Sequence, residues 1–259
     1  MPYHCRVKVF VINLPGIEDR KSWMKLHLAE RGLQFEFIDG IDGRKWSDEQ
    51  IKRLVTPRLF NLYSSNKGWL TKGAIAVTKA VIENFYKRII AGDIDYAVFM
   101  EDDVVLSDSF VDDLKEIESR LKAKKAEGIF LMHYMLKQPT RLKELKSIKL
   151  SGNHTAYKMK PGQKVGSGAG FIASKGAAEQ MIANHTPIDA IADWWTDHKN
   201  LDVHIVYPPM LNSGKFTSTL GYTKSPWLRV MSKIGFLNSI IEHARLRRSK
   251  RATFKNVIE

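Results

Sequence analysis

Three adjacent carboxylates give the sequence its clearest sign of chemistry. Glu101, Asp102 and Asp103 follow an apolar run over residues 95–100 that is typical of a buried strand. Ligands of open α/β sheets bind at the carboxyl ends of strands. Neighbouring carboxylates repel one another unless a cation or solvent screens them, and Mg²⁺ or Mn²⁺ prefers such oxygens. The triplet predicts a metal site, and the alternative is a solvated acidic turn capping a helix near Ser107.

Alternating strands and helices would position this triplet. Apolar and β-branched runs predict strands near residues 6–14, 35–38, 95–100, 128–133, 166–173 and 203–207. Helical spacing predicts helices over residues 19–31, 71–91, 110–121, 175–184 and 188–198. This alternation favours an α/β fold with a mostly parallel sheet flanked by helices. Residues 139–165 are rich in lysine and fit either a hairpin or a loop.

Length and composition indicate one enzyme-sized folded unit. The chain has 259 residues, and 44% of them are hydrophobic, enough for a substantial core. The single cysteine, Cys5, cannot form an internal disulfide, so a cytosolic home is expected. The sequence contains neither a signal-peptide pattern nor an apolar run long enough to span a membrane.

The excess positive charge is concentrated in the tail. The formal net charge is +13, and residues 224–259 hold nine Lys/Arg against two Glu, or +7. Apolar residues recur there every three or four positions from Trp227 to Ala244, which predicts a basic amphipathic helix. Such a helix either docks on its own domain or lies on an anionic membrane surface.

Several ordered motifs resemble glycosyltransferase family 25, the bacterial lipopolysaccharide and lipooligosaccharide galactosyltransferases. The resemblance covers residues 6–222. The matching pieces are VFVINL (9–14) with Arg20 and Trp23, FEFIDGIDG (35–43), LT (70–71), YAVFMEDDV (96–104) with Phe110, GFIAS (170–174) with Ala177, PID (187–189), YPPML (207–211) and STLG (218–221). The block around the acidic triplet is the most recognisable of them.

The resemblance implies a transferase of GT-A type over residues 1–222, followed by the basic segment 223–259. In such enzymes an acidic motif holds Mn²⁺ or Mg²⁺ against the diphosphate of a sugar nucleotide. Asp103 with Glu101 or Asp102 would therefore hold the metal and the donor. By the same resemblance, Asn13, Asp39 and Asp42 would lie near the uridine and ribose.

The implied reaction moves a hexose, galactose before glucose, from a UDP-sugar to a lipid-linked oligosaccharide with inversion. An inverting transfer requires a base apart from the metal cluster. Asp189, in the family-like PID, and Asp193, one turn later on the predicted helix 188–198, are the candidates. The alternative for Asp189 is a helix N-cap. The expected location is cytoplasmic, on the inner face of the bacterial inner membrane, with the tail on anionic lipid.

One segment departs from the family. Where the family has Gly-Glu-Ile-Gly-Cys and then Ser-His, this chain has GAIAV (73–77) and then AV (80–81). Lys72, Thr78 or Lys79 could take over the missing role, or substrate choice differs. The competing hypotheses are another metal-dependent enzyme, which lacks a phosphate-cradling loop, and a non-catalytic binder of anionic surfaces. The body of the chain has no nucleic-acid motif, so no nucleic-acid partner is expected.

Overall fold

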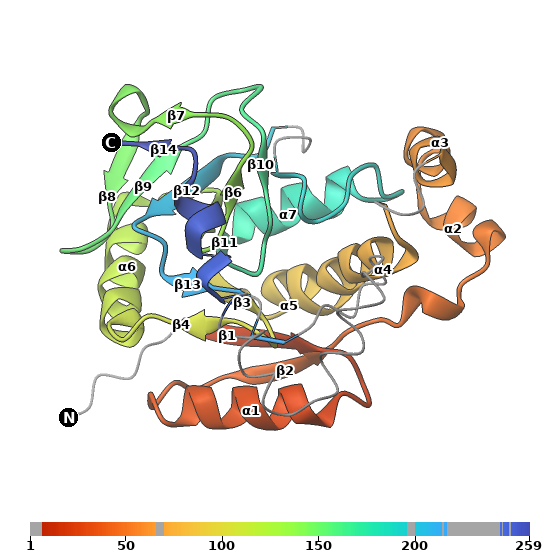
Figure 1. The fold of residues 1–259 in the computed structure, drawn as a ribbon, viewed down its shortest axis with the longest axis horizontal. Helices are drawn as coiled ribbons and strands as arrows, with labels where there is room; N and C mark the ends of the chain where they lie inside the picture. Colours follow the sequence, from red (N-terminus) through yellow and green to blue (C-terminus); the bar gives the residue numbers. More distant parts are fainter. Residues whose placement is uncertain are drawn as a thin grey trace.

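An eight-stranded sheet forms the centre of the computed structural model, which describes residues 7–65, 70–195, 200–213, 215–216, 244, 246–248 and 250–259 (Figure 1). Its strand order is β2 (Glu36–Asp39), β1 (Lys8–Asn13), β3 (Tyr96–Glu101), β11 (Gly170–Ser174), β5 (Ile129–Leu131), β12 (Val203–Tyr207), β9 (Thr155–Lys158) and β8 (Ser147–Lys149). Within this sheet only β11 and β9 run against the other strands. The predicted α/β fold with a mostly parallel sheet is confirmed.

Helices cover both faces of the sheet because each strand alternates its apolar side chains between them. Val9 and Val11 of β1 pack with α1 (Glu18–Ala29) and α6 (Phe110–Lys124). Phe10 and Ile12 face the other layer, which contains α4 (Lys72–Val81), α5 (Lys87–Ala91) and α7 (Lys175–Asn184). The short helices α2 (Asp48–Leu54) and α3 (Pro57–Ser65) extend this second layer.

The predicted helix over residues 71–91 is continuous but contains a π-helical turn, Ile82–Tyr86, between α4 and α5. Thr71 caps its start, where the side-chain oxygen accepts a hydrogen bond from Ala74 N. The residues whose spacing of three and four predicts this helix, namely Ile75, Thr78, Ile82, Phe85 and Ile89, are all buried. The apolar spacing therefore identified the buried side of this helix correctly.

The predicted helix over residues 188–198 is wrong for its described part, residues 188–195. Ile188 N donates to Leu54 O at 3.0 Å, and Ala192 N donates to the Thr78 hydroxyl at 2.9 Å, so these amides are not used in a helical ladder. The apolar residues that suggested a helix, Ile188, Ile191 and Trp195, are buried in the core instead. An irregular segment can thus present apolar side chains at helical spacing.

The described residues also form three two-stranded sheets outside the central sheet. They pair β4 (Val105–Leu106) with β13 (Leu211–Asn212), β6 (Met135–Leu136) with β10 (Val165–Gly166), and β7 (Thr140–Arg141) with β14 (Val257–Ile258). The lysine-rich region 139–165 contains the hairpin β8–β9, one of its two predicted forms.

The C-terminal end of the chain reaches back to the domain through β14. Most of the predicted amphipathic helix, residues 227–244, lies outside the described residues. Within the described part of the chain, no helix combines the length and apolar character needed to cross a bilayer.

Candidate active site

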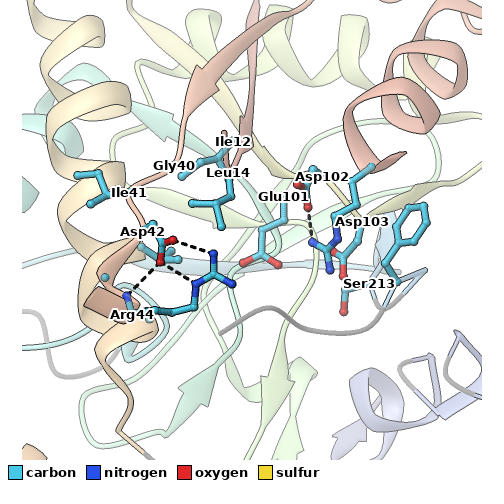
Figure 2. A pocket seen from close by; sticks show the side chains of 15 residues that line it. Ile12, Leu14, Gly40, Ile41, Asp42, Arg44, Glu101, Asp102, Asp103 and Ser213 are labelled. Atoms are coloured by element: carbon cyan, nitrogen blue, oxygen red, sulfur yellow. Dashed lines mark hydrogen bonds and ion pairs between the residues drawn. The ribbon is translucent and has the colours of Figure 1, made fainter. Parts of the chain in front are cut away.

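A cavity of about 290 Å³ lies where three parallel strands end. Ile12 and Leu14 contribute from the end of β1, residues 40–44 follow β2, and residues 101–103 end β3. Arg20 of α1, Gly73 and Val77 of α4, and Ser213 and Phe216 complete the wall. Figure 2 shows Glu101 between the Asp42–Arg44 pair on one side and Asp103 on the other. The strand-end position predicted for the acidic triplet is therefore where the cavity lies.

The three carboxylates of the triplet have different surroundings. Asp102 is buried, and its two oxygens accept from Arg20 Nη1 at 2.5 Å and from Asn13 Nδ2 at 2.8 Å. This ion pair ties the end of β3 to α1 and β1. Glu101 and Asp103 line the same cavity. Asp102 thus acts mainly as a structural anchor, and Glu101 and Asp103 are placed to meet a ligand.

The ionised form of Glu101 is unfavourable in this cavity. Burial raises its pKa well above the ordinary value, and the neighbouring carboxylates of Asp103, Asp193 and Asp102 raise it further, while Arg20 opposes them. Each of these acidic neighbours makes a second negative charge unfavourable. A cation in the cavity would relieve this repulsion and restore the ionised form of Glu101.

The residues present fit a small divalent cation that shares its ligands with a substrate. The described residues contain no cluster of three or more His, Cys, Asp or Glu able to enclose a metal. Mg²⁺ is ordinarily held by one or two carboxylates together with substrate phosphates. Glu101 and Asp103 supply such a pair, and the cavity between them and Arg44 leaves room for phosphate oxygens.

The loop after β2 forms the opposite wall. Asp42 caps a short 3₁₀ turn (Gly43–Lys45) by accepting from Arg44 N, and the Arg44 side chain holds both of its carboxylate oxygens at 2.8 and 2.7 Å. These hydrogen bonds lower the pKa of Asp42 to about 2, so it stays ionised at neutral pH. A Cβ on Gly43 would lie 2.6 Å from the Ala76 Cβ, so glycine lets this loop press against α4.

Asp193 approaches the carboxylates from the irregular segment 188–195. Burial raises the pKa of Asp193 to about 6, with Lys137 acting in the opposite direction. Two hydrogen bonds from neighbouring residues hold this segment in place: Ala192 N donates to Thr78 Oγ1, and the side-chain Nε1 of Trp195 donates to Ser167 O at 2.8 Å. A half-buried carboxylate with a pKa near neutrality, near enough to Glu101 to raise the pKa of Glu101, is suited to acid–base chemistry.

A family model described as glycosyltransferase family 25, lipopolysaccharide biosynthesis protein, matches residues 6–196. The chain belongs to glycosyltransferase family 25. The matched region runs from β1 to the end of the segment that carries Asp193, and it includes the whole acidic triplet. A search of curated proteins gives no match. The protein is thus a glycosyltransferase of a lipopolysaccharide-biosynthesis family.

Four predicted site residues of this family 25 glycosyltransferase do not line the cavity, namely Asn13, Asp39, Asp189 and Asp193. Asn13 is buried and holds Asp102. Asp39 is exposed, and its carbonyl accepts from Asn84 Nδ2 at 2.7 Å. Asp189 accepts from Thr56 Oγ1 at 2.6 Å and from Arg58 Nε at 3.1 Å, which anchors the start of segment 188–195. Of the two candidate bases, the structure brings only Asp193 to the carboxylates.

The paired tryptophans beside Asp193 do not form an exposed sugar platform. Trp195 is fully buried and packs edge-on against Phe171 at 4.9 Å between ring centroids, while Trp194 is partly buried against the core. Trp195 is therefore a core residue. Gly168 permits this packing, because a Cβ there would lie 2.7 Å from the Trp195 ring.

Sequence reasoning did not assign a role to several residues of the family 25 site. Arg20 stood in a matching motif without a function, and Arg44 and Phe216 lay in no motif.

His133 bridges two serines, with Nδ1 at 2.9 Å from Ser167 Oγ and Nε2 at 3.2 Å from Ser213 Oγ. Burial lowers the pKa of His133 to about 4, so the ring is neutral near pH 7. In the sequence, His133 is a single histidine at the end of the strand predicted over residues 128–133, and nothing in that pattern indicated this bridge.

Proposed function

We propose that the protein transfers a hexose, galactose in the first instance, from a UDP-sugar to a saccharide hydroxyl of lipid-linked lipopolysaccharide, with inversion and on a GT-A-type fold. One observation carries this proposal: Glu101 and Asp103 share a cavity at the carboxyl ends of β1, β2 and β3. Such crevices are the usual nucleotide sites of open α/β sheets. Family membership supplies the reaction class.

Mn²⁺ or Mg²⁺ would be held by Glu101 and Asp103 and would neutralise the diphosphate as the bond to the sugar breaks. The chain's own residues prepare this site. The ion pair of Arg20 with Asp102 fixes the end of β3, so that the two ligand carboxylates are preorganised. Apolar side chains at Ile12, Leu14 and Val77 exclude water from the donor side of the cavity.

Asp193 is the proposed base. With a pKa of about 6 it is mostly ionised at neutral pH yet basic enough to accept a proton. As the acceptor oxygen forms its bond to the anomeric carbon, its proton passes to an Asp193 oxygen. The bond between that carbon and the diphosphate oxygen breaks, and its electron pair leaves with the UDP.

Two residues of the altered segment 73–81 line the cavity in which we propose that the donor binds. Gly73 and Val77 line its wall, whereas Ala74 and Ile75 are buried in the core. The differences from the family pattern are therefore expected to act on donor choice. UDP-glucose is the alternative donor for this reason.

The remaining partners follow from the acceptor. The proposed acceptor is a lipid-linked oligosaccharide, which places the protein in the cytoplasm at the inner face of the inner membrane. The basic tail would contribute to binding that anionic surface. A non-catalytic protein with the same fold and the same tail is the competing account.

Transfer of labelled galactose from UDP-galactose to a deacylated core oligosaccharide tests this function. Wild type and Asp189→Asn should transfer at similar rates, because Asn keeps the acceptor oxygen for Thr56 and Arg58. Asp193→Asn should lose about 100-fold or more in kcat, the usual contribution of a general base. Equal rates in both variants would remove Asp193 from the mechanism. Absence of transfer from both UDP-galactose and UDP-glucose would favour the non-catalytic account.

A further inference from the structure

The C-terminal end of the chain is part of the folded domain. Residues 250–254 are helical, and Thr253 among them is buried. β14 then pairs in parallel with β7, and Asn256 Nδ2 donates to Leu136 O at 2.6 Å. The Phe254 ring contacts that of Tyr207 at 5.9 Å between centroids. The tail end is therefore a fixed surface element of the domain.

This docking places the tail at the same end of the sheet as the cavity. Tyr207 ends β12 and Leu136 lies beyond the carboxyl end of β5. Both strands run in the direction of β3, because β11 is antiparallel to β3 and β5 while β12 is parallel to β5. Figure 1 shows β14, in dark blue, next to β7. The chain after β13 supplies Ser213 to the cavity.

Most of the excess charge of the protein lies in the two segments joined by this docking. Residues 137–164 hold eight Lys/Arg and one Glu, and residues 246–259 hold five Lys/Arg and one Glu. These segments thus carry +7 and +4 of the net +13. We define the basic rim as seven exposed cations from both segments: Lys137, Lys164, Arg247, Arg248, Lys250, Arg251 and Lys255.

The rim reaches the candidate active site. Lys137 N donates to Lys164 O at 3.0 Å, which holds the two domain cations of the rim together. The Lys137 side chain lies over Gly166, where a Cβ would be 3.8 Å from its Nζ and 3.7 Å from Asp193 O. The cationic surface therefore runs from the tail to the edge of the segment that carries Asp193.

We propose that the basic rim docks the protein on an anionic lipid bilayer and turns the cavity toward it. The orientation rests on the proposed function, because a lipid-linked acceptor lies at that surface, whereas the docking itself does not. Ile258 supports a lipid partner. It is one of two large apolar side chains exposed in the described chain, and it lies in β14 beside the rim. An apolar side chain among cations suits a headgroup boundary, while single-stranded nucleic acid is usually bound on exposed aromatic rings.

Co-sedimentation of the full chain with vesicles tests this surface. The rim variant replaces Arg247, Arg248, Lys250 and Arg251 with Gln. A matched control replaces Lys25, Lys52, Lys124 and Lys125 with Gln, which removes the same charge from exposed positions elsewhere. Vesicles are phosphatidylcholine alone or an equimolar mixture with phosphatidylglycerol. Thermal unfolding of each variant checks that the fold is retained.

Wild type and control should bind the phosphatidylglycerol vesicles and not phosphatidylcholine alone, and added salt should weaken binding. The rim variant should bind about 100-fold more weakly or worse, because each cation near an anionic surface contributes separately. The proposal would be overturned if the rim variant bound these vesicles as tightly as wild type, or if the rim and control variants lost the same affinity. It would also be overturned if wild type bound a single-stranded oligonucleotide more tightly than the vesicles.

The outcome is separable from that of the proposed function. UDP-galactose binding in solution should be the same in the rim variant and wild type. A wild-type protein that binds vesicles but no sugar nucleotide would leave the docking surface intact and remove the proposed transferase reaction.

Discussion

Removal of the Arg20 side-chain charge should strongly destabilise the protein. In Arg20→Met the chain length is kept, but the carboxylate of Asp102 loses the guanidinium 2.5 Å away. The side chains of Arg20 and Asp102 are only 10% and 8% exposed, so water cannot replace the lost partner. Breaking a buried pair by removing one member costs about 3–5 kcal/mol, because the other charge stays buried. Asn13 Nδ2 still donates to the other Asp102 oxygen in this variant.

The unfolding free energy of wild type and Arg20→Met, measured by urea denaturation with circular dichroism, gives this difference. Arg44→Met is the matched control, because the same substitution removes an exposed partner of Asp42 and should leave the unfolding free energy unchanged within error. Adding Asp102→Asn to Arg20→Met should recover much of the loss. A loss below about 1 kcal/mol in Arg20→Met, or one equal to that of Arg44→Met, would refute the anchoring role.

Three further predictions concern single residues. Thr78→Val should lower the unfolding free energy by about 1–3 kcal/mol, because the buried Ala192 amide loses its acceptor, and should lower kcat while UDP-galactose affinity is kept. Thr78→Ser should restore the unfolding free energy and kcat, and an unchanged kcat in Thr78→Val would show that Thr78 does not position Asp193. Gly43→Ala should weaken donor binding and lower the unfolding free energy by about 1–3 kcal/mol, because the new methyl group meets α4. Calorimetry would measure donor binding and urea denaturation the unfolding free energy, and wild-type values of both would refute the close contact. Burial lowers the pKa of His204 from 6.5 to about 4, so between pH 6.5 and pH 4 the unfolded chain binds more protons than the folded protein and the unfolding free energy falls as the pH falls. His204→Gln should lose less unfolding free energy than wild type over that pH range, and an equal or larger loss in the variant would contradict the buried neutral state of His204.

The sheet and the position of the acidic triplet could be predicted because their signals are local. Alternation of Val9 and Val11 with Phe10 and Ile12 marks a strand with both faces covered. Residues 101–103 follow such a strand directly, so their place at its carboxyl end required no knowledge of distant contacts. The metal ligands, the sugar nucleotide and the lipid-linked acceptor stay predictions.

The roles within the site could not be predicted because they depend on partners far apart in sequence. Arg20 lies 82 residues from Asp102, and Thr78 lies 114 residues from Ala192. The periodicity over residues 188–198 favoured a helix that would have placed Asp189 and Asp193 on one face. Hydrogen bonds to other elements replace that helix in the described part, and they separate the two aspartates.

Titration calorimetry with UDP-galactose tests the central claim, that Glu101 and Asp103 bind a sugar nucleotide through a divalent cation. Wild type should bind in the presence of Mn²⁺, and chelator should abolish the binding. Asp103→Asn should lose it even with Mn²⁺, whereas Asp108→Asn, which changes an exposed aspartate five residues along, should bind like wild type. Binding that survives both the chelator and Asp103→Asn would contradict the claim.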